Sequence, residues 1–177
     1  MSALPQTRRI ATAGTALVLA FGLFRGQLAA AVVTRGDDVL RTGDVGGALR
    51  FYRRALLLDR FSTTAADRLA FHLALRHNAV DARSAIEIAD AALRATPSSA
   101  PLFADRAFAE VQLRAWPAAE RDFARAGDLG HDVRYEHFAS RIALRRGEPE
   151  AARAFARRAL AWDPAFAPAR TLLRHLQ

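Results

Sequence analysis

The residues best suited to acid–base or metal chemistry are the five histidines of this 177-residue chain. His72 and His77 are five residues apart, whereas two metal ligands on one face of a helix need a spacing of three or four. His131, His137 and His175 belong to no motif for catalysis or metal binding. Histidines in this arrangement are typical of solvated or packed side chains, so the sequence predicts no metal site.

Other patterns that carry chemistry do not occur in the sequence. Cysteine is absent, which excludes disulfides, thiolate metal sites and a cysteine nucleophile. The chain has no glycine-rich phosphate loop, no GxSxG motif and no pair of carboxylates at catalytic spacing. Asp37 and Asp38 are adjacent, as on a solvated helix or at its junction with a membrane. The sequence therefore predicts a protein that is not an enzyme and that has no cofactor and no small-molecule substrate.

The composition is that of a folded protein with an excess of arginine. About half of the residues are apolar and a quarter are charged, which excludes wholesale disorder. The net charge is +8, and all 26 basic residues are arginine. Because these arginines are spread over the whole chain, which is also rich in alanine, they are more typical of a GC-rich genome than of a phosphate-binding surface gathered on one face. An arginine-rich nucleic-acid-binding module is kept as an alternative hypothesis.

An uncharged apolar segment, residues 10–24, follows two arginines near the N-terminus. It fits a secretory signal peptide cleaved after Ala31. It also fits an uncleaved anchor, because a helix continued to residue 33 is about 36 Å long and spans a bilayer core of roughly 30 Å. We favour the anchor, since cleavage would remove the first turn of the first repeat helix described below. The arginine pair predicts a cytoplasmic N-terminus.

Three small residues of this segment, Gly22, Gly26 and Ala30, are spaced four residues apart. Such a ridge lets helices approach closely in a membrane. Glycine and alanine are also common in membrane helices generally, so the spacing is compatible with an ordinary anchor. As a hypothesis, the ridge is a packing surface for a partner helix.

The rest of the chain repeats a pattern of small residues. Four stretches align when the sequence is compared with itself: residues 43–60, 84–97, 115–131 and 147–164. Each contains two alanines seven residues apart, which lets helix axes cross closely, and each ends twelve residues after the first alanine. The first alanines, which are 37, 34 and 33 residues apart, are Ala48, Ala85, Ala119 and Ala152. The second are Ala55, Ala92, Ala126 and Ala159.

This pattern resembles the tetratricopeptide repeat family, whose unit is a pair of antiparallel helices of about 34 residues. Tyr52 and Phe123 fit the bulky position four residues after the first alanine, whereas Ala89 and Ala156 do not. The resemblance implies an all-α fold, in which a right-handed superhelical stack of about four helix hairpins follows one transmembrane helix. The expected parts are a tail and anchor over 1–28 and a repeat domain over 29–177, with units near 29–61, 62–98, 99–131 and 132–165 and a capping helix over 166–177.

The first helices of the units are less regular in sequence. We expect them over residues 29–42, 63–76, 101–114 and 134–146, with residues 77–81 as a lengthened turn in the second unit. Glu110 stands where the family has a bulky aromatic residue, which weakens the register of the third unit. Trp116 and Trp162 lie near a turn and a helix end, where stacked repeats commonly bury a large side chain.

The resemblance also implies a partner-binding groove, lined by the first helix of each unit. Three of its positions, Phe71, Phe108 and Phe138, are equally compatible with core packing in a shifted register. The aspartates in the groove disfavour the family variant that grips a free C-terminal carboxylate, so a mixed apolar and charged protein segment is expected. The groove positions are Asp37, Arg41, Asp67, Arg68, Phe71, Asp105, Phe108, Gln112, Arg134, His137, Phe138 and Arg141.

These observations lead to one main hypothesis and its alternatives. The chain is expected to be a single-pass scaffold of the bacterial cytoplasmic membrane, with its repeat domain outside the cytoplasm. It would serve as an accessory subunit or assembly factor of a larger membrane or envelope complex, with protein partners. A secreted soluble adaptor, released after Ala31, is the first alternative, and the nucleic-acid-binding module is the second.

Overall fold

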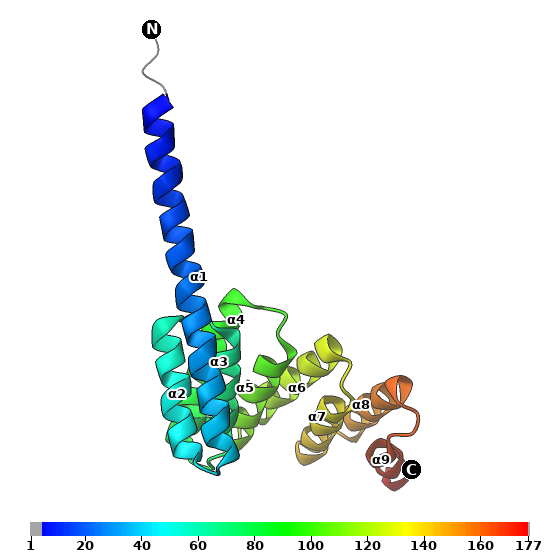
Figure 1. The fold of residues 1–177 in the computed structure, drawn as a ribbon. Helices are drawn as coiled ribbons and strands as arrows, with labels where there is room; N and C mark the ends of the chain where they lie inside the picture. Colours follow the sequence, from blue (N-terminus) through cyan, green and yellow to red (C-terminus); the bar gives the residue numbers. More distant parts are fainter. Residues whose placement is uncertain (1–4, 177) are drawn as a thin grey trace. The chain divides into compact units, whose positions relative to one another are not determined.

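The computed structural model describes the backbone of residues 5–176 and the side chains of residues 22–176. All secondary structure in this part of the chain is α-helical (Figure 1). The chain divides into a first unit, Met1–Ala65, and a second unit, Ala66–Gln177. The helices are α1 (Pro5–Arg41), α2 (Val45–Leu58), α3 (Thr63–Ala74), α4 (Ala79–Ala95), α5 (Ala100–Gln112), α6 (Trp116–Gly130), α7 (Val133–Arg145), α8 (Pro149–Trp162) and α9 (Ala167–His175).

In the first unit, α2 packs against the C-terminal half of the long helix α1 (Figure 1). The two helices cross at Gly36, where an added Cβ would lie 2.6 Å from Cε1 of Tyr52. The Tyr52 ring is fully buried, and its hydroxyl donates a hydrogen bond of 2.7 Å to Oδ1 of Asp37. The bulky position recognised in the sequence therefore holds this hairpin together, and it needs a glycine opposite it.

The turn between α1 and α2 is fixed by two residues. Gly43 has a φ of +87°, in the left-handed region that favours glycine. Asp44 is the N-cap of α2, and its Oδ1 accepts a hydrogen bond of 2.6 Å from the backbone N–H of Gly47. This bond satisfies one of the backbone donors that a helix leaves unpaired at its start.

In the second unit, the helices from α4 to α9 pack against one another in the order of the sequence (Figure 1). The first alanines of the repeats, which the sequence predicted at the helix crossings, are all fully buried. The second alanines are fully buried as well, except for Ala92, which is half-buried and has the fully buried Ala89 beside it. Small side chains therefore allow the close packing of helices that the repeat pattern predicted.

The second repeat corrects one prediction. Residues 77–81 do not form a lengthened turn, because α4 begins at Ala79 and has 17 residues. Asn78 caps this helix, and its side-chain oxygen accepts a hydrogen bond of 2.8 Å from the backbone N–H of Asp81. His77 makes the turn before it, with a φ of +53°. The extra residues of this repeat thus lengthen its second helix.

Charged side chains join neighbouring helices of the second unit. Arg106 of α5 donates to both oxygens of Asp122 of α6, at 2.5 and 2.9 Å, and to Asp90 of α4 at 2.5 Å. Arg158 of α8 donates two hydrogen bonds, of 2.9 and 3.2 Å, to Oε2 of Glu136, which is fully buried in α7. The bidentate Arg106–Asp122 pair fixes orientation as well as contact, so it sets the register between α5 and α6.

Among the described residues, no helix has both the length and the apolar character needed to cross a bilayer. Most of the expected membrane segment, residues 10–21, lies outside the described side chains. Of the small-residue ridge, Gly22 and Ala30 are exposed, and an added Cβ at Gly22 would meet nothing within 4 Å. At Gly26 an added Cβ would approach Oδ2 of Asp59 at 3.9 Å. The use of this ridge by a partner helix stays a prediction.

Candidate functional site

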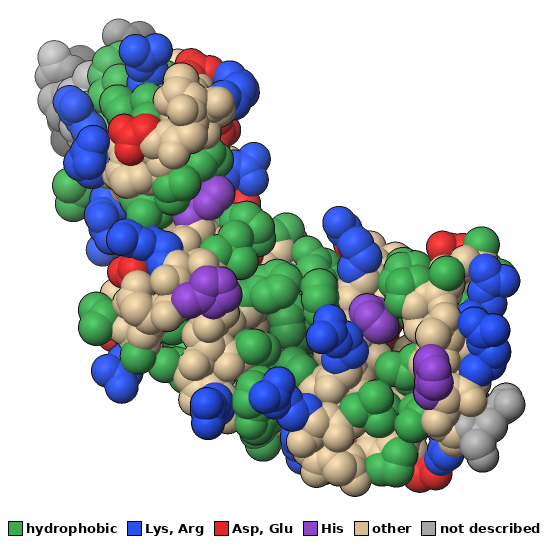
Figure 2. Space-filling model, turned by 90° about the horizontal axis from the view of Figure 1, so that it is seen from below, with side chains coloured by type: hydrophobic (Ala, Val, Ile, Leu, Met, Phe, Trp, Pro, Cys, Tyr) green, Lys and Arg blue, Asp and Glu red, His purple; other side chains and the backbone are tan. Residues whose placement is uncertain are grey.

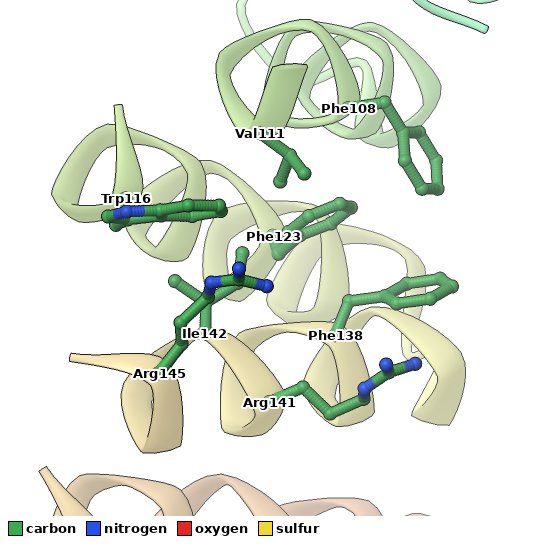
Figure 3. A pocket seen from close by; sticks show the side chains of 8 residues that line it. All are labelled: Phe108, Val111, Trp116, Phe123, Phe138, Arg141, Ile142 and Arg145. Atoms are coloured by element: carbon green, nitrogen blue, oxygen red, sulfur yellow. The ribbon is translucent and has the colours of Figure 1, made fainter. Parts of the chain in front are cut away.

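A hollow of about 310 Å³ opens between α5, α6 and α7 (Figure 3). We call it the aromatic hollow. Figure 2 shows hydrophobic side chains gathered on one face of the protein, with arginine and histidine side chains around them. The aromatic hollow is lined by Phe108, Val111, Trp116, Phe123, Phe138, Arg141, Ile142 and Arg145.

Three phenylalanines, one from each helix, form the apolar part of the aromatic hollow (Figure 3). The ring centre of Phe108 lies 5.0 Å from that of Phe123 and 5.3 Å from that of Phe138, and the last two are 5.2 Å apart. Phe71 of α3 extends the row, with its ring edge-to-face on Phe108 at 6.4 Å and 37% of its surface exposed. Phe123 is buried, whereas Phe108 and Phe138 are half-buried. The row therefore belongs partly to the core and partly to the surface.

Two arginines of α7 border the aromatic hollow. Arg141 and Arg145 are four residues apart, which places both on one face of the helix (Figure 3). The guanidinium carbon of Arg145 lies 4.6 Å from the ring centre of Trp116, a cation–π contact that orients both side chains. None of the described carboxylates lines the hollow. The site thus combines aromatic walls with a positively charged border.

A second, shallower hollow lies on the other side of Arg141, between α7 and α9. We call it the terminal hollow. His137 lines it, and burial, followed by the positive charge of Arg141, lowers the pKa of this histidine. The Nδ1 atom of His137 is buried and has no hydrogen-bond partner among the described residues. The residues that line the terminal hollow are His137, Arg141, Ala167, Pro168, Thr171, Leu172 and His175.

Asp105 corrects a prediction, because a partner cannot reach a side chain that is 3% exposed. Burial is the main cause that raises the pKa of Asp105 to about 9, and the nearby carboxylate of Asp67 adds to it. The two side chains share a hydrogen bond, which requires a proton on one of them. Asp105 therefore lies beneath the expected groove as a neutral acid that fixes α5 to α3.

The other predicted groove residues have varied roles. Phe108, Phe138 and Arg141 line the aromatic hollow, Phe71 extends its row of rings, and His137 lines the terminal hollow. The remaining polar side chains bind neighbours within the protein. These contacts are Asp37 with Tyr52, Arg41 with Asp38, Arg68 with Asp67 at 3.3 Å, Gln112 with His77 at 3.1 Å, and Arg134 with Asp132 at 2.5 Å.

Five lining residues, Val111, Trp116, Phe123, Ile142 and Arg145, were not among the predicted groove positions, although Phe123 had been assigned to the bulky position of its repeat. A signal for three of them was present in the sequence. Val111 follows Phe108 by three residues, and Ile142 and Arg145 follow Phe138 by four and seven, which are the spacings of one helical face. Trp116 had no such signal, because it lies beyond the turn that separates α5 from α6.

The described side chains provide no grouping suited to a metal ion: among residues 22–176, no three or more histidines and carboxylates come together. Further carboxyl groups have shifted pKa values, and Glu110 is among them. Burial raises the pKa of Glu110 to about 7, with a smaller effect from the carboxylate of Asp122. Its Oε2 atom is buried without a hydrogen-bond partner in the described structure. Glu110 thus keeps a polar group at the position where the family has an aromatic ring.

Comparisons with protein-family models and with curated protein sequences give no match. Solved structures do match. A crystal structure of MamA superposes with a TM-score of 0.71 at 20% sequence identity, over 80% of this chain and 81% of MamA. PilF of Pseudomonas aeruginosa gives 0.72 at 17% identity, over 86% of this chain and 68% of PilF. YrrB, described as a TPR protein with an unusual peptide-binding site, gives 0.65 at 20% identity, over 82% and 74% of the two chains.

These similarities show that the chain has the tetratricopeptide repeat fold. They confirm the prediction of an all-helical stack of hairpins, made from the alanine spacing and the resemblance. At identities of 20% and below, they carry no information on the partner. The argument for a function therefore rests on the surface of this chain.

Proposed function

We propose that this protein is an interaction scaffold that binds a segment of a partner protein over α5 and α7. The observation that carries the proposal is the aromatic hollow. A hollow of about 310 Å³ lined by aromatic side chains has the size and character of a site for a large apolar side chain. Peptides and helices commonly dock on repeat proteins through such anchor side chains.

The exposed part of the phenylalanine row supports this proposal. Phe71 leaves 37% of its surface in water, next to the half-buried Phe108. An aromatic side chain gains free energy when a partner covers it, at roughly 25 cal/mol per Å² of apolar surface. The rings contact one another edge-to-face and are held by four helices, so the side chains lose little conformational freedom on binding.

Within the same proposal, the N-terminal segment tethers the scaffold to the bacterial cytoplasmic membrane. Residues 10–24 carry no charge, and in the first unit large apolar side chains remain exposed next to arginines. Leu57 is 81% and Phe61 62% exposed, and the guanidinium of Arg60 lies 4.6 Å from the ring of Phe61. Apolar side chains flanked by arginine are typical of a membrane–water boundary. The repeat domain would then lie outside the cytoplasm and serve a larger membrane or envelope complex.

The binding site is tested by site-specific photo-crosslinking of the full chain in its native membrane. A photoreactive residue replaces Val111, in the aromatic hollow, and in a control chain it replaces Val80, which is 70% exposed on α4. We expect a discrete crosslinked protein at position 111 that is missing at position 80. The same set of adducts at both positions, or none at 111, would contradict the proposed site.

The tether is tested separately by intact mass and by alkaline extraction of membranes. We expect the full-length mass and retention in the membrane pellet. A species that begins at Val32 would replace the tether with the secreted adaptor and would leave the binding proposal intact. Release of the uncleaved chain by alkali would also refute the tether.

A further inference from the structure

We infer that the partner segment carries a side-chain carboxylate between two large apolar side chains, and that Arg141 recognises this carboxylate. The inference rests on the proposed binding function and specifies the chemistry of the partner. It depends on the position of Arg141, which lines the aromatic hollow on one side and the terminal hollow on the other. A segment that fills both hollows must pass over this arginine.

Both hollows provide apolar surface for an anchor. In the aromatic hollow, Phe108 and Phe138 supply it. In the terminal hollow, Pro168 and Leu172 of α9 supply it. Apolar anchors on either side would exclude water from the position between them, and a charge contact is stronger where water is excluded.

Charge complementarity selects an acid for the central position. Arg141 is exposed, and among residues 22–176 no carboxylate lies within ion-pair distance of it, whereas Arg134 on the same helix is paired with Asp132 at 2.5 Å. Arg145 adds a second positive charge at the border of the aromatic hollow. In the part of the chain whose side chains are described, no aspartate or glutamate lines either hollow. An arginine in this setting attracts a carboxylate and repels a basic side chain.

A carboxylate can come from an aspartate or glutamate side chain or from a chain terminus. The geometry favours the side chain, because apolar surface continues on both sides of Arg141 and a chain terminus would fill one side alone. Peptides with amidated and with free C-termini distinguish the two sources.

The test uses the full chain in mild detergent and fluorescein-labelled peptides of twelve residues with amidated C-termini. Each peptide holds one phenylalanine and one leucine, three to seven residues apart, with aspartate, serine or arginine midway between them. Fluorescence anisotropy gives Kd for each peptide. We expect the best aspartate peptide to bind about fivefold more tightly than its serine counterpart, and the arginine peptide to bind more weakly than both.

Substitutions then assign the preference to one residue. Arg141→Glu should abolish the preference for aspartate, and Arg141→Lys should retain part of it, because lysine keeps the charge but loses the bidentate geometry. Arg157→Glu is the matched control: this exposed arginine of α8 lines neither hollow, so the preference should remain.

Three outcomes would overturn the inference. They are equal affinity for the three central residues, an Arg141→Glu variant that behaves like Arg157→Glu, and binding that needs a free C-terminal carboxylate. A complete lack of peptide binding would overturn it as well. In each case, a discrete crosslink at position 111 would show that the proposed binding function still holds, so the two failures can be told apart.

Discussion

Because Asp105 is a buried acid with a raised pKa, the stability of the fold should fall as the pH rises. The substitution Asp105→Asn should remove this pH dependence. Asparagine has the same shape, and its amide N–H₂ can donate to the carboxylate of Asp67 in place of the shared proton. Arg68 and Asp67 of α3 and Tyr135 of α7 are the other ionisable groups coupled to Asp105. The substitution therefore keeps the contact between α3 and α5 and removes the carboxyl group that titrates at position 105.

The expected size follows from proton linkage. The unfolded carboxyl loses its proton near pH 3.8, whereas burial raises the pKa of folded Asp105 to about 9. Between these values the folded state holds one more proton, so the free energy of unfolding falls as the pH rises, by about 1.4 kcal/mol per pH unit. From pH 7 to 8.5 the wild-type chain should lose about 2 kcal/mol. Glu110, with a pKa of about 7, contributes mainly below this window.

The assay is urea denaturation of the full chain in mild detergent, followed by circular dichroism at pH 7, 7.5, 8 and 8.5. We expect the loss of stability with pH in the wild-type chain and less than half of it in Asp105→Asn. Glu87→Gln, which removes an exposed carboxylate on α4, serves as the control and should keep the wild-type slope. Equal slopes for Asp105→Asn and the wild-type chain would refute a protonated Asp105.

Two further predictions concern packing. Gly36→Ala should destabilise the first unit by about 1–2 kcal/mol, because its Cβ would meet the buried tyrosine ring of α2 at 2.6 Å. The control Gly46→Ala, whose nearest contact is at 3.6 Å, should be neutral or stabilising. Equal midpoints of urea denaturation for the two variants would refute this prediction. Arg158→Met should cost about 3 kcal/mol at pH 7 by isolating the buried carboxyl group of Glu136. The cost should be smaller at lower pH, because burial raises the pKa of this group and favours its neutral form, while Arg157→Met should have little effect. A loss independent of pH would argue against the ion pair.

The helix pairs were predictable because the small residues that they need at their crossings recur at fixed spacings along the sequence. Two helices can cross closely where the side chains are small, and the alanines at the crossings are buried as their spacing predicted. The start of α4 was missed although Asn78, followed three residues later by Asp81, is a recognisable cap. Alignment of the repeats compares only their small residues, so it does not detect such a cap.

The site was predictable only in part, because it depends on how side chains from separate helices meet. Phe108 and Phe138 fell at the family's groove positions, and they do line the aromatic hollow. Trp116 also lines the hollow, but it lies beyond the turn between α5 and α6, so the spacing of residues on one helix does not predict its position. The burial of Asp105 was also hidden, because a charged residue is expected in water unless its neighbour can share a proton.

The three-way contact of Arg106 has a consequence for how the array can vary in length. Its guanidinium joins a carboxylate of α4 to one of α6, and these helices come from consecutive hairpins. If the chain were cut between α4 and α5, the first fragment would keep Asp90 without its arginine, and the second would keep Arg106 paired with Asp122 alone. Helices α4, α5 and α6 should therefore unfold together. Hairpins can be added or removed, in evolution or by design, with less loss of stability elsewhere than between α4 and α5.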